Sequence, residues 1–241
     1  MIKTQRSFSV KCSIQDTKVS VRIYAKKKVN DSINYTSKQA DFIKSVSTND
    51  IVVLHGKPGT GKTRCAVDTG VKLLLTNNVK RLVITRPAVC QEESHGFLPG
   101  TLEEKMKPWL MPIYDALNCN FSPSELDSLI KNRVIEISPL AYMRGRTFVD
   151  SFILCDEAQN CTTGQLKMIM TRIGRNSRMV ITGDPEQDDL RLPNGQHNGL
   201  TDLLNRMNVY GAPEGVDVIT FGTSEVVRHN VIPGILSLYS K

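Results

Sequence analysis

The sequence predicts an α/β fold in which a mostly parallel sheet carries helices on both faces. Short apolar runs rich in β-branched residues recur along the chain without polar alternation, as is typical of strands buried on both faces. Longer amphipathic helical patterns separate these runs, which predicts right-handed crossovers between parallel strands. At 241 residues the chain is long enough for one large α/β domain. The predicted strands cover 51–55, 81–85, 134–137, 152–155, 179–182 and 216–221.

The N-terminal arm is basic and carries the whole charge excess. The net charge is +7, and residues 1–28 contain eight basic residues against Asp16 alone. Apolar residues alternate with polar ones on both sides of a polar turn at 15–18, which predicts a β-hairpin with one buried face. Lys11 and Arg22 fall on the other face. They either keep a solvated edge from aggregating or contact nucleic-acid phosphates, and charge alone does not decide. We therefore expect a hairpin arm over 1–29 and one domain over 30–241.

A phosphate-binding loop follows the first strand of that domain. Glycines let the backbone wrap closely round a phosphate with its N–H groups aimed inward, and the lysine is a mobile charge for the β- and γ-phosphates. The strand before the loop and the helix after it favour this reading over a plain glycine-rich turn, so we expect a nucleotide here. The loop consists of Gly56, Lys57, Pro58, Gly59, Thr60, Gly61, Lys62 and Thr63, and Arg64 follows it.

Helix signals lie between the predicted strands. Thr36 or Ser37 is expected to cap a helix running to about Val46. After the second strand, a helical stripe from 102 to 117 contains Pro108 and Pro112, which we expect to kink or divide it. Capping-box patterns begin at Thr101, Ser122 and Thr162.

Acidic and polar residues follow two later strands. Asp156 and Glu157 stand at the end of the strand 152–155. With the Thr63 hydroxyl, Asp156 is a candidate Mg²⁺ ligand, and Glu157 is a candidate base for an attacking water. The strand 179–182 delivers the segment 183–187, including Asp184, to the same edge of the sheet, where ligands bind in such folds.

These motifs resemble those of known ATPases. Asp156-Glu157-Ala158-Gln159 is similar to the D-E-A-Q motif of superfamily 1 helicases, and the segment 183–187 is similar to their G-D-x-x-Q motif. More closely, the chain resembles the PhoH family of P-loop ATPases, over roughly residues 36 to 239. The strings that carry this resemblance are Ile84–Val89, Gly96–Gly100, Pro139–Thr147 and Val227–His229.

The resemblance implies a RecA-like core, ATP hydrolysis and a role linked to RNA or single-stranded nucleic acid. It implies that Gln39 contacts the adenine, although from the sequence alone a surface glutamine is the simpler reading. It also implies that Gln187 senses the γ-phosphate and that Arg228 approaches it. It does not reach the basic arm.

One departure concerns assembly. Superfamily 1 helicases carry two RecA-like cores, whereas this chain has room for one, so we do not expect a monomer to unwind duplexes. Related single-core ATPases form rings, and we expect a homo-oligomer, most plainly a hexamer. Arg144, Arg146 or Arg228 is expected to act across the interface, with a salt-bridge or surface role as the alternative for each.

Two other functions stay open at this stage, a P-loop kinase and a nucleotide-gated assembly protein without nucleic-acid activity. No apolar run approaches the length of a membrane span, and the six cysteines form no C-x-x-C pair. We expect a protein of the bacterial or phage-infected cytoplasm with reduced thiols and no membrane partner.

Overall fold

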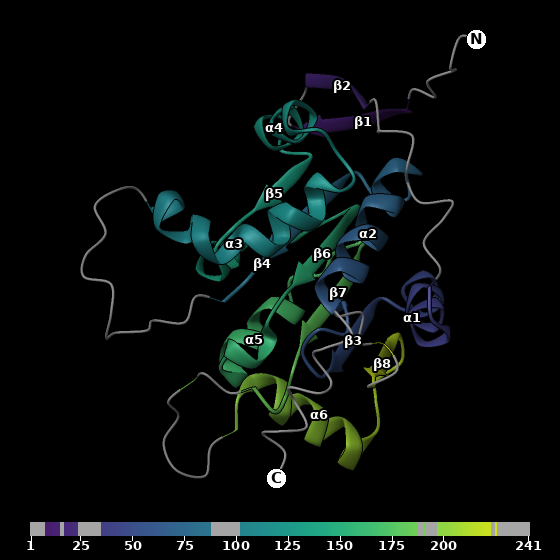
Figure 1. Ribbon diagram of the computed structural model, residues 1–241, viewed down its shortest axis with the longest axis vertical. Helices are drawn as coiled ribbons and strands as arrows, with labels where there is room; N and C mark the ends of the chain where they lie inside the picture. The colour runs from purple at the N-terminus through teal and green to yellow at the C-terminus, as the bar shows by residue number, and fades with distance from the viewer. Residues whose placement is uncertain are drawn as a thin grey trace, which may run out of the picture.

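The predicted parallel sheet is present in the computed structural model. The structure describes residues 8–14, 17–23, 35–87, 102–187, 190, 197–222 and 225. Six strands form one sheet in the order β5-β4-β6-β7-β3-β8, and every neighbouring pair is parallel (Figure 1). The predicted α/β fold with a P-loop core is therefore confirmed. The strands are β3 (Ile51–Gly56), β4 (Arg81–Thr85), β5 (Ile135–Ile137), β6 (Ser151–Cys155), β7 (Arg178–Gly183) and β8 (Val216–Phe221).

Helices cover both faces of the sheet. Side chains of the strands alternate between two cores, so Val52 and Leu54 pack with α1 to α4, whereas Ile51 and Val53 pack with α5, α6 and two 3₁₀ turns. The helices are α1 (Ser37–Thr48), α2 (Lys62–Leu75), α3 (Leu102–Asn118), α4 (Pro123–Lys131), α5 (Thr163–Met170) and α6 (Gly199–Tyr210). The 3₁₀ turns are η1 (Leu140–Met143) and η2 (Ala158–Asn160).

Three helix starts carry reciprocal capping boxes. The side chains of Thr36, Ser122 and Thr162 each accept a hydrogen bond from the backbone N–H three residues on. The glutamine or glutamate at that position accepts in turn from the backbone N–H of the cap residue. Thr101, the fourth expected cap, lies outside the described residues.

Two prolines were expected to kink or divide the helix after β4. The expected division is wrong, because α3 runs unbroken over 17 residues. Each proline removes its own N–H donor from the helix, at positions 108 and 112. Burial of Leu110, Ile113 and Leu117 in the core stabilises the helix against that loss.

The N-terminal arm forms the predicted hairpin. β1 (Phe8–Ile14) pairs antiparallel with β2 (Thr17–Ile23), from Phe8 opposite Ile23 to Ile14 opposite Thr17. Its assignment as a unit separate from residues 30–241 stays a prediction, as does the role of its basic residues.

The strand order brings three polar segments to one edge of the sheet. β7 lies between β3, which leads into the phosphate-binding loop, and β6, which ends before Asp156. Because all three strands are parallel, the residues that follow them meet at their carboxyl ends.

In the described part of the chain, no helix is both long and apolar enough to cross a membrane.

Candidate nucleotide site

The phosphate-binding loop needs glycine at two points. Gly56 has a φ of 150°, and a Cβ there would lie 2.2 Å from the Phe221 carbonyl oxygen on β8. Gly61 caps α2 in the left-handed conformation, with a φ of 79°. Among the described residues, no side chain caps α2 at this end, and no acidic residue stands in its first turn. The first N–H groups of α2 are therefore left for an anion, which the helix dipole also favours.

Lys62 closes the loop onto itself. Its ammonium donates to the carbonyl oxygens of Gly56 at 2.5 Å and Lys57 at 2.9 Å. Thr60, which is fully buried, also donates to Lys57 at 2.9 Å. Lys57 is exposed and Pro58 is next to it at the tip of the loop. These contacts hold the lysine charge inside the loop, where a phosphate would lie.

Asp156 joins the loop to the middle of the sheet. Its Oδ1 accepts from the hydroxyl of Thr63 at 2.9 Å and from that of Thr182, on β7, at 2.5 Å. The side chain is buried, and Oδ2 has no hydrogen-bond partner among the described residues. Burial foremost, and then the charge of Glu157, raises the pKa of Asp156, while Thr182, Arg86 and Thr63 oppose the rise.

This arrangement fits a divalent cation. Carboxylate and hydroxyl oxygens are the ligands that Mg²⁺ takes, and it usually keeps several waters and phosphate oxygens besides. A buried carboxylate oxygen without a partner is costly unless something fills its place. Asp156 and Thr63 are thus the residues that would hold the ion, and their role as ligands stays a prediction. Within the described residues, no three or more His, Cys, Asp or Glu side chains are grouped so that they could hold a metal ion by themselves.

The backbone of Glu157 is strained, and a hydrogen bond orients its side chain. Its φ is 55°, in the left-handed region that non-glycine residues seldom occupy. Its Oε2 accepts from the Gln159 amide at 2.6 Å, and Gln159 Oε1 in turn accepts from the backbone N–H of Asp184 at 3.1 Å. Gln159 is buried and links the end of β6 to the loop after β7. It has no predicted role, although it is the last residue of the D-E-A-Q string.

Arg86 is a second residue that the sequence did not reveal. It follows β4, the neighbour of β6, so it reaches the same edge of the sheet. Its Nη1 lies 3.8 Å from Asp156 Oδ2, and its Nη2 lies 3.7 Å from Glu157 Oε1. The order of the strands is the signal that would have identified it, and that order is not readable from the sequence alone.

Three residues predicted to contact the nucleotide, Gln39, Asp184 and Gln187, lie within the described part of the chain. Gln39 is buried, with its amide nitrogen 3.9 Å from where a Cβ on Gly61 would stand, and its Oε1 accepts from the backbone of Thr36. Asp184 is buried, and its Oδ1 accepts from the Glu186 backbone. Gln187 is exposed in the turn after β7. Their roles toward a nucleotide stay predictions.

His55, which precedes the loop, has a changed acidity. Its imidazole is hydrogen-bonded to the Thr220 hydroxyl at 2.9 Å. Burial and then the charge of Lys62 lower its pKa, against a smaller opposing effect of Asp184. The histidine next to the loop is therefore held neutral near neutral pH.

The predicted arginines differ in their surroundings. Arg64 donates to Asp68 at 2.7 Å and to the Cys119 sulfur at 3.0 Å.

Arg146 forms a two-pronged ion pair with Glu136 on β5, and its guanidinium stacks over the Phe148 ring at 4.7 Å. Arg144 is exposed, and Arg228 lies outside the described residues. Arg146 thus has a structural role within its own chain, while action across an interface stays a prediction for all three candidates.

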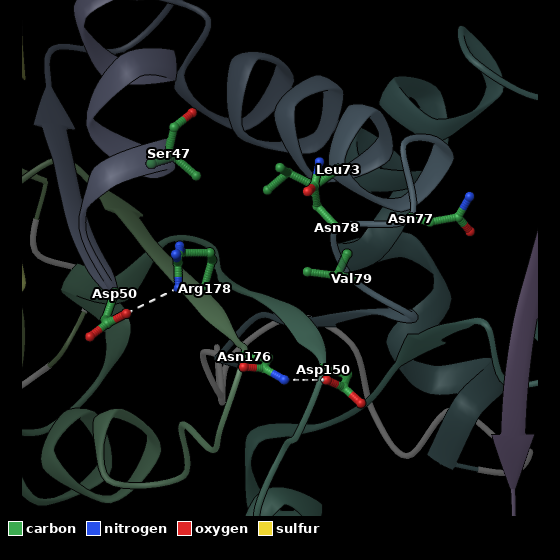
Figure 2. A pocket seen from close by; sticks show the side chains of 10 residues that line it. Ser47, Asp50, Leu73, Asn77, Asn78, Val79, Asp150, Asn176 and Arg178 are labelled. Atoms are coloured by element: carbon green, nitrogen blue, oxygen red, sulfur yellow. Dashed lines mark hydrogen bonds and ion pairs between the residues drawn. The ribbon is translucent and has the colours of Figure 1, made fainter.

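A separate cleft of about 620 Å³ opens at the opposite edge of the sheet. Its lining comes from the amino ends of the strands and from the ends of α1 and α2 (Figure 2). Asp50 pairs with Arg178 at 3.0 Å, and Asp150 accepts from Asn176 at 3.0 Å and pairs with Lys80 at 2.6 Å. Because its charges are paired and the phosphate-binding loop lies at the other edge, this cleft is not the nucleotide site.

Comparisons with known proteins agree with the geometry. A family model described as PhoH-like protein matches residues 33–240. The chain is 42% identical over 206 residues to a PhoH-like protein of Bacillus subtilis (strain 168). The match covers 86% of this chain and 63% of that protein. It is 35% identical over 204 residues to Protein PhoH of Escherichia coli (strain K12), which covers 84% of this chain and 56% of that protein. The chain therefore spans less than two thirds of the length of either relative.

A solved structure shares the fold. The large terminase from a thermophilic bacteriophage superposes with a TM-score of 0.51 at 10% identity, over 85% of this chain and 50% of that one. At this identity the likeness concerns the fold alone.

Proposed function

Since the chain belongs to the PhoH-like family and has the fold of a P-loop nucleoside triphosphatase, we propose that it is a Mg²⁺-dependent ATP hydrolase. The observation that carries the proposal is the hydrogen bond from Thr63 to Asp156, next to a Glu157 side chain that Gln159 orients. A phosphate-binding loop, a carboxylate fit for a divalent cation and a candidate base thus converge at one edge of the sheet. This is the set of groups that phosphoryl transfer to water requires.

Each residue has a proposed task. The loop N–H groups and Lys62 bind the β- and γ-phosphates, and the ammonium exchanges its carbonyl partners for phosphate oxygens. Asp156 and Thr63 hold Mg²⁺, which when bound neutralises charge that develops on the phosphate oxygens. Glu157 orients a water and takes its proton at a carboxylate oxygen. Gln187, near the end of β7, is proposed to sense the γ-phosphate.

Phosphate release from ATP in the absence of any acceptor is the direct test. The wild-type protein is expected to release phosphate only in the presence of Mg²⁺. A Lys62→Ala variant is expected to release none, because the phosphate-facing charge is lost. Transfer to an added acceptor without release to water would indicate a kinase instead. Tight ATP binding by the wild-type protein without release of either kind would favour an assembly protein.

Single-stranded nucleic acid is the proposed partner. The hairpin arm supplies the basic charge, and phosphate contacts of that kind weaken as salt rises. ATP turnover is expected to rise on addition of single-stranded RNA or DNA. A variant lacking residues 1–28 is expected to bind such strands more weakly, with a shallower slope of log K against log salt. An unchanged slope would assign those lysines and arginines to a solvated edge.

A homo-oligomer, most plainly a hexamer, is the proposed active form. An arginine from a neighbouring subunit is worth roughly 10³–10⁵ in rate where it has been measured in GTPases. Sedimentation with Mg²⁺ and a non-hydrolysable ATP analogue tests the assembly. Mixed Lys62→Ala and Arg144→Ala subunits, each inactive alone, are expected to regain activity together if Arg144 acts across the interface. Full turnover by a monomer at every concentration would exclude this form.

A further inference from the structure

The guanidinium of Arg86 lies between the two carboxylates of the site. One nitrogen is 3.8 Å from Asp156 Oδ2, and the other is 3.7 Å from Glu157 Oε1. At these distances the contacts are charge attractions rather than hydrogen bonds. The two terminal nitrogens of its planar fork thus face one acid each.

Burial limits how much water screens the contact between Arg86 and Asp156. The Arg86 side chain is 19% exposed and that of Asp156 is 2% exposed, so water screens their attraction little. In addition, adjacent carboxylates repel each other, and Arg86 is a cation that the structure places against both. The arginine therefore acts as a counter-ion inside the site.

The oxygen that Arg86 faces is also the one left for a metal. Asp156 Oδ1 is occupied by the hydroxyls of Thr63 and Thr182, whereas Oδ2 has no hydrogen-bond partner among the described residues. A cation that binds Asp156 must therefore approach an oxygen that already has a positive charge beside it. Two cations so close would repel each other.

We propose that Arg86 competes with the divalent cation for Asp156 and serves as the counter-ion of Asp156 and Glu157 until the cation binds. The inference rests on the proposed function, because it takes Mg²⁺ as the ion. It makes Arg86 a positioning residue whose guanidinium gives way at Asp156 when the metal enters. It also sets the Mg²⁺ concentration at which the site fills.

Binding of ADP, measured by calorimetry at a series of Mg²⁺ concentrations, tests the competition without any turnover. Arg86→Gln is expected to lower the Mg²⁺ concentration for half-maximal ADP binding by about tenfold, the low end of what a nearby charge does to a carboxylate. Arg86→Lys keeps one charge and is expected to give an intermediate value. Arg178→Gln, which removes an ion-paired arginine at the opposite edge of the sheet, is expected to leave it unchanged.

A second readout concerns the protein without nucleotide or metal. Loss of the counter-ion leaves two adjacent acids unpaired, so the melting temperature of Arg86→Gln is expected to fall in the absence of Mg²⁺ and to recover when Mg²⁺ and ADP are added. A purely structural role would lower it equally in both conditions and would overturn the proposal. Should Arg86→Gln not fold, Arg86→Lys carries both measurements.

The outcomes separate this inference from the proposed function. If ADP binding to the wild-type protein does not depend on Mg²⁺, the proposed Mg²⁺-dependent chemistry is wrong. If it does depend on Mg²⁺ and the arginine variants match the wild-type curve, or need more Mg²⁺, Arg86 is no competitor and only the inference fails.

Discussion

The hydroxyl of Thr63 donates to Asp156 Oδ1 over 2.9 Å, although the two residues stand 93 positions apart in the chain. Thr63 belongs to the first turn of α2, and Asp156 directly follows β6, two strands away from β3. The intervening strand, β7, contributes Thr182 to the same oxygen. Three segments thus fix one carboxylate group and leave its second oxygen turned toward Arg86.

Glu157→Gln is expected to keep nucleotide binding and to lose hydrolysis. The amide preserves the shape of the side chain but does not accept a proton, and general-base catalysis is worth about 10²–10⁴ in rate. Phosphate release and ADP affinity measured on one preparation check both halves. Glu214→Gln, at an exposed position between α6 and β8, is the matched control and is expected to turn over at the wild-type rate. Hydrolysis by Glu157→Gln at the wild-type rate would remove Glu157 from the role of base.

Gln159→Ala tests the link between the two loops of the site. It removes the donor to Glu157 and the acceptor of the Asp184 N–H, so the base loses its orientation. A misplacement of about 1 Å can cost roughly 10² in rate, and we expect a fall of that order in turnover with ADP affinity kept. Gln165→Ala, which breaks a capping box on α5 instead, is expected to lower stability but not turnover. Equal turnover in both variants would speak against a positioning role for Gln159.

The sequence predicted those parts of the fold and site whose signals are local. Three of the four expected helix caps are present, and the fourth lies outside the described residues. The glycine-rich loop, the apolar strands and the residues after them lie as expected, because each depends on residue spacing within one segment. Arg86 and Gln159 were missed for a different reason. Their partners come from other segments, and only the order of strands β4, β6 and β7 brings them together.

Local patterns also misled at one place. The two prolines of α3 break the rule for helix interiors, yet Ile113 and Leu117 between α3 and the sheet are fully buried and stabilise the helix. The propensity of a residue is a weak term beside the burial of an amphipathic face.

Gly56→Ala is expected to destabilise the fold as well as the site. The added Cβ would stand 2.2 Å from the Phe221 carbonyl oxygen, at a φ of 150° that side chains disfavour, so β8 and the loop must separate. A cost of about 1–3 kcal/mol follows from backbone strain alone. Gly164→Ala is the matched control, because Gly164 lies in the first turn of α5 and an added Cβ there would meet no atom within 4 Å. It is expected to be neutral or to stabilise by about 0.5–1 kcal/mol. Chemical denaturation of both variants measures the contrast, and equal curves would contradict it.

The ion pair between Glu136 and Arg146 predicts a pH-dependent share of stability. The hydrogen bonds from Arg146 lower the pKa of Glu136 below its ordinary value of 4.5, against an opposing effect of burial. A carboxyl whose pKa is lower in the folded state stabilises the fold above its unfolded pKa, and that contribution is lost as pH falls through the folded pKa.

The free energy of unfolding of Glu136→Gln is therefore expected to lie about 1 kcal/mol below that of the wild type at pH 7, an amount kept small by the partly exposed guanidinium. The two proteins are expected to converge as pH falls below the ordinary value, whereas Glu214→Gln should follow the wild type throughout. Denaturation curves between pH 3 and pH 7 measure this, and a constant difference in the free energy of unfolding would contradict the assigned pKa direction.

The result also bears on assembly. If Arg146→Ala shows the same pH-dependent loss, its defect is at least partly structural. Subunit-mixing experiments on an arginine across the interface are then better made with Arg144, whose side chain is exposed.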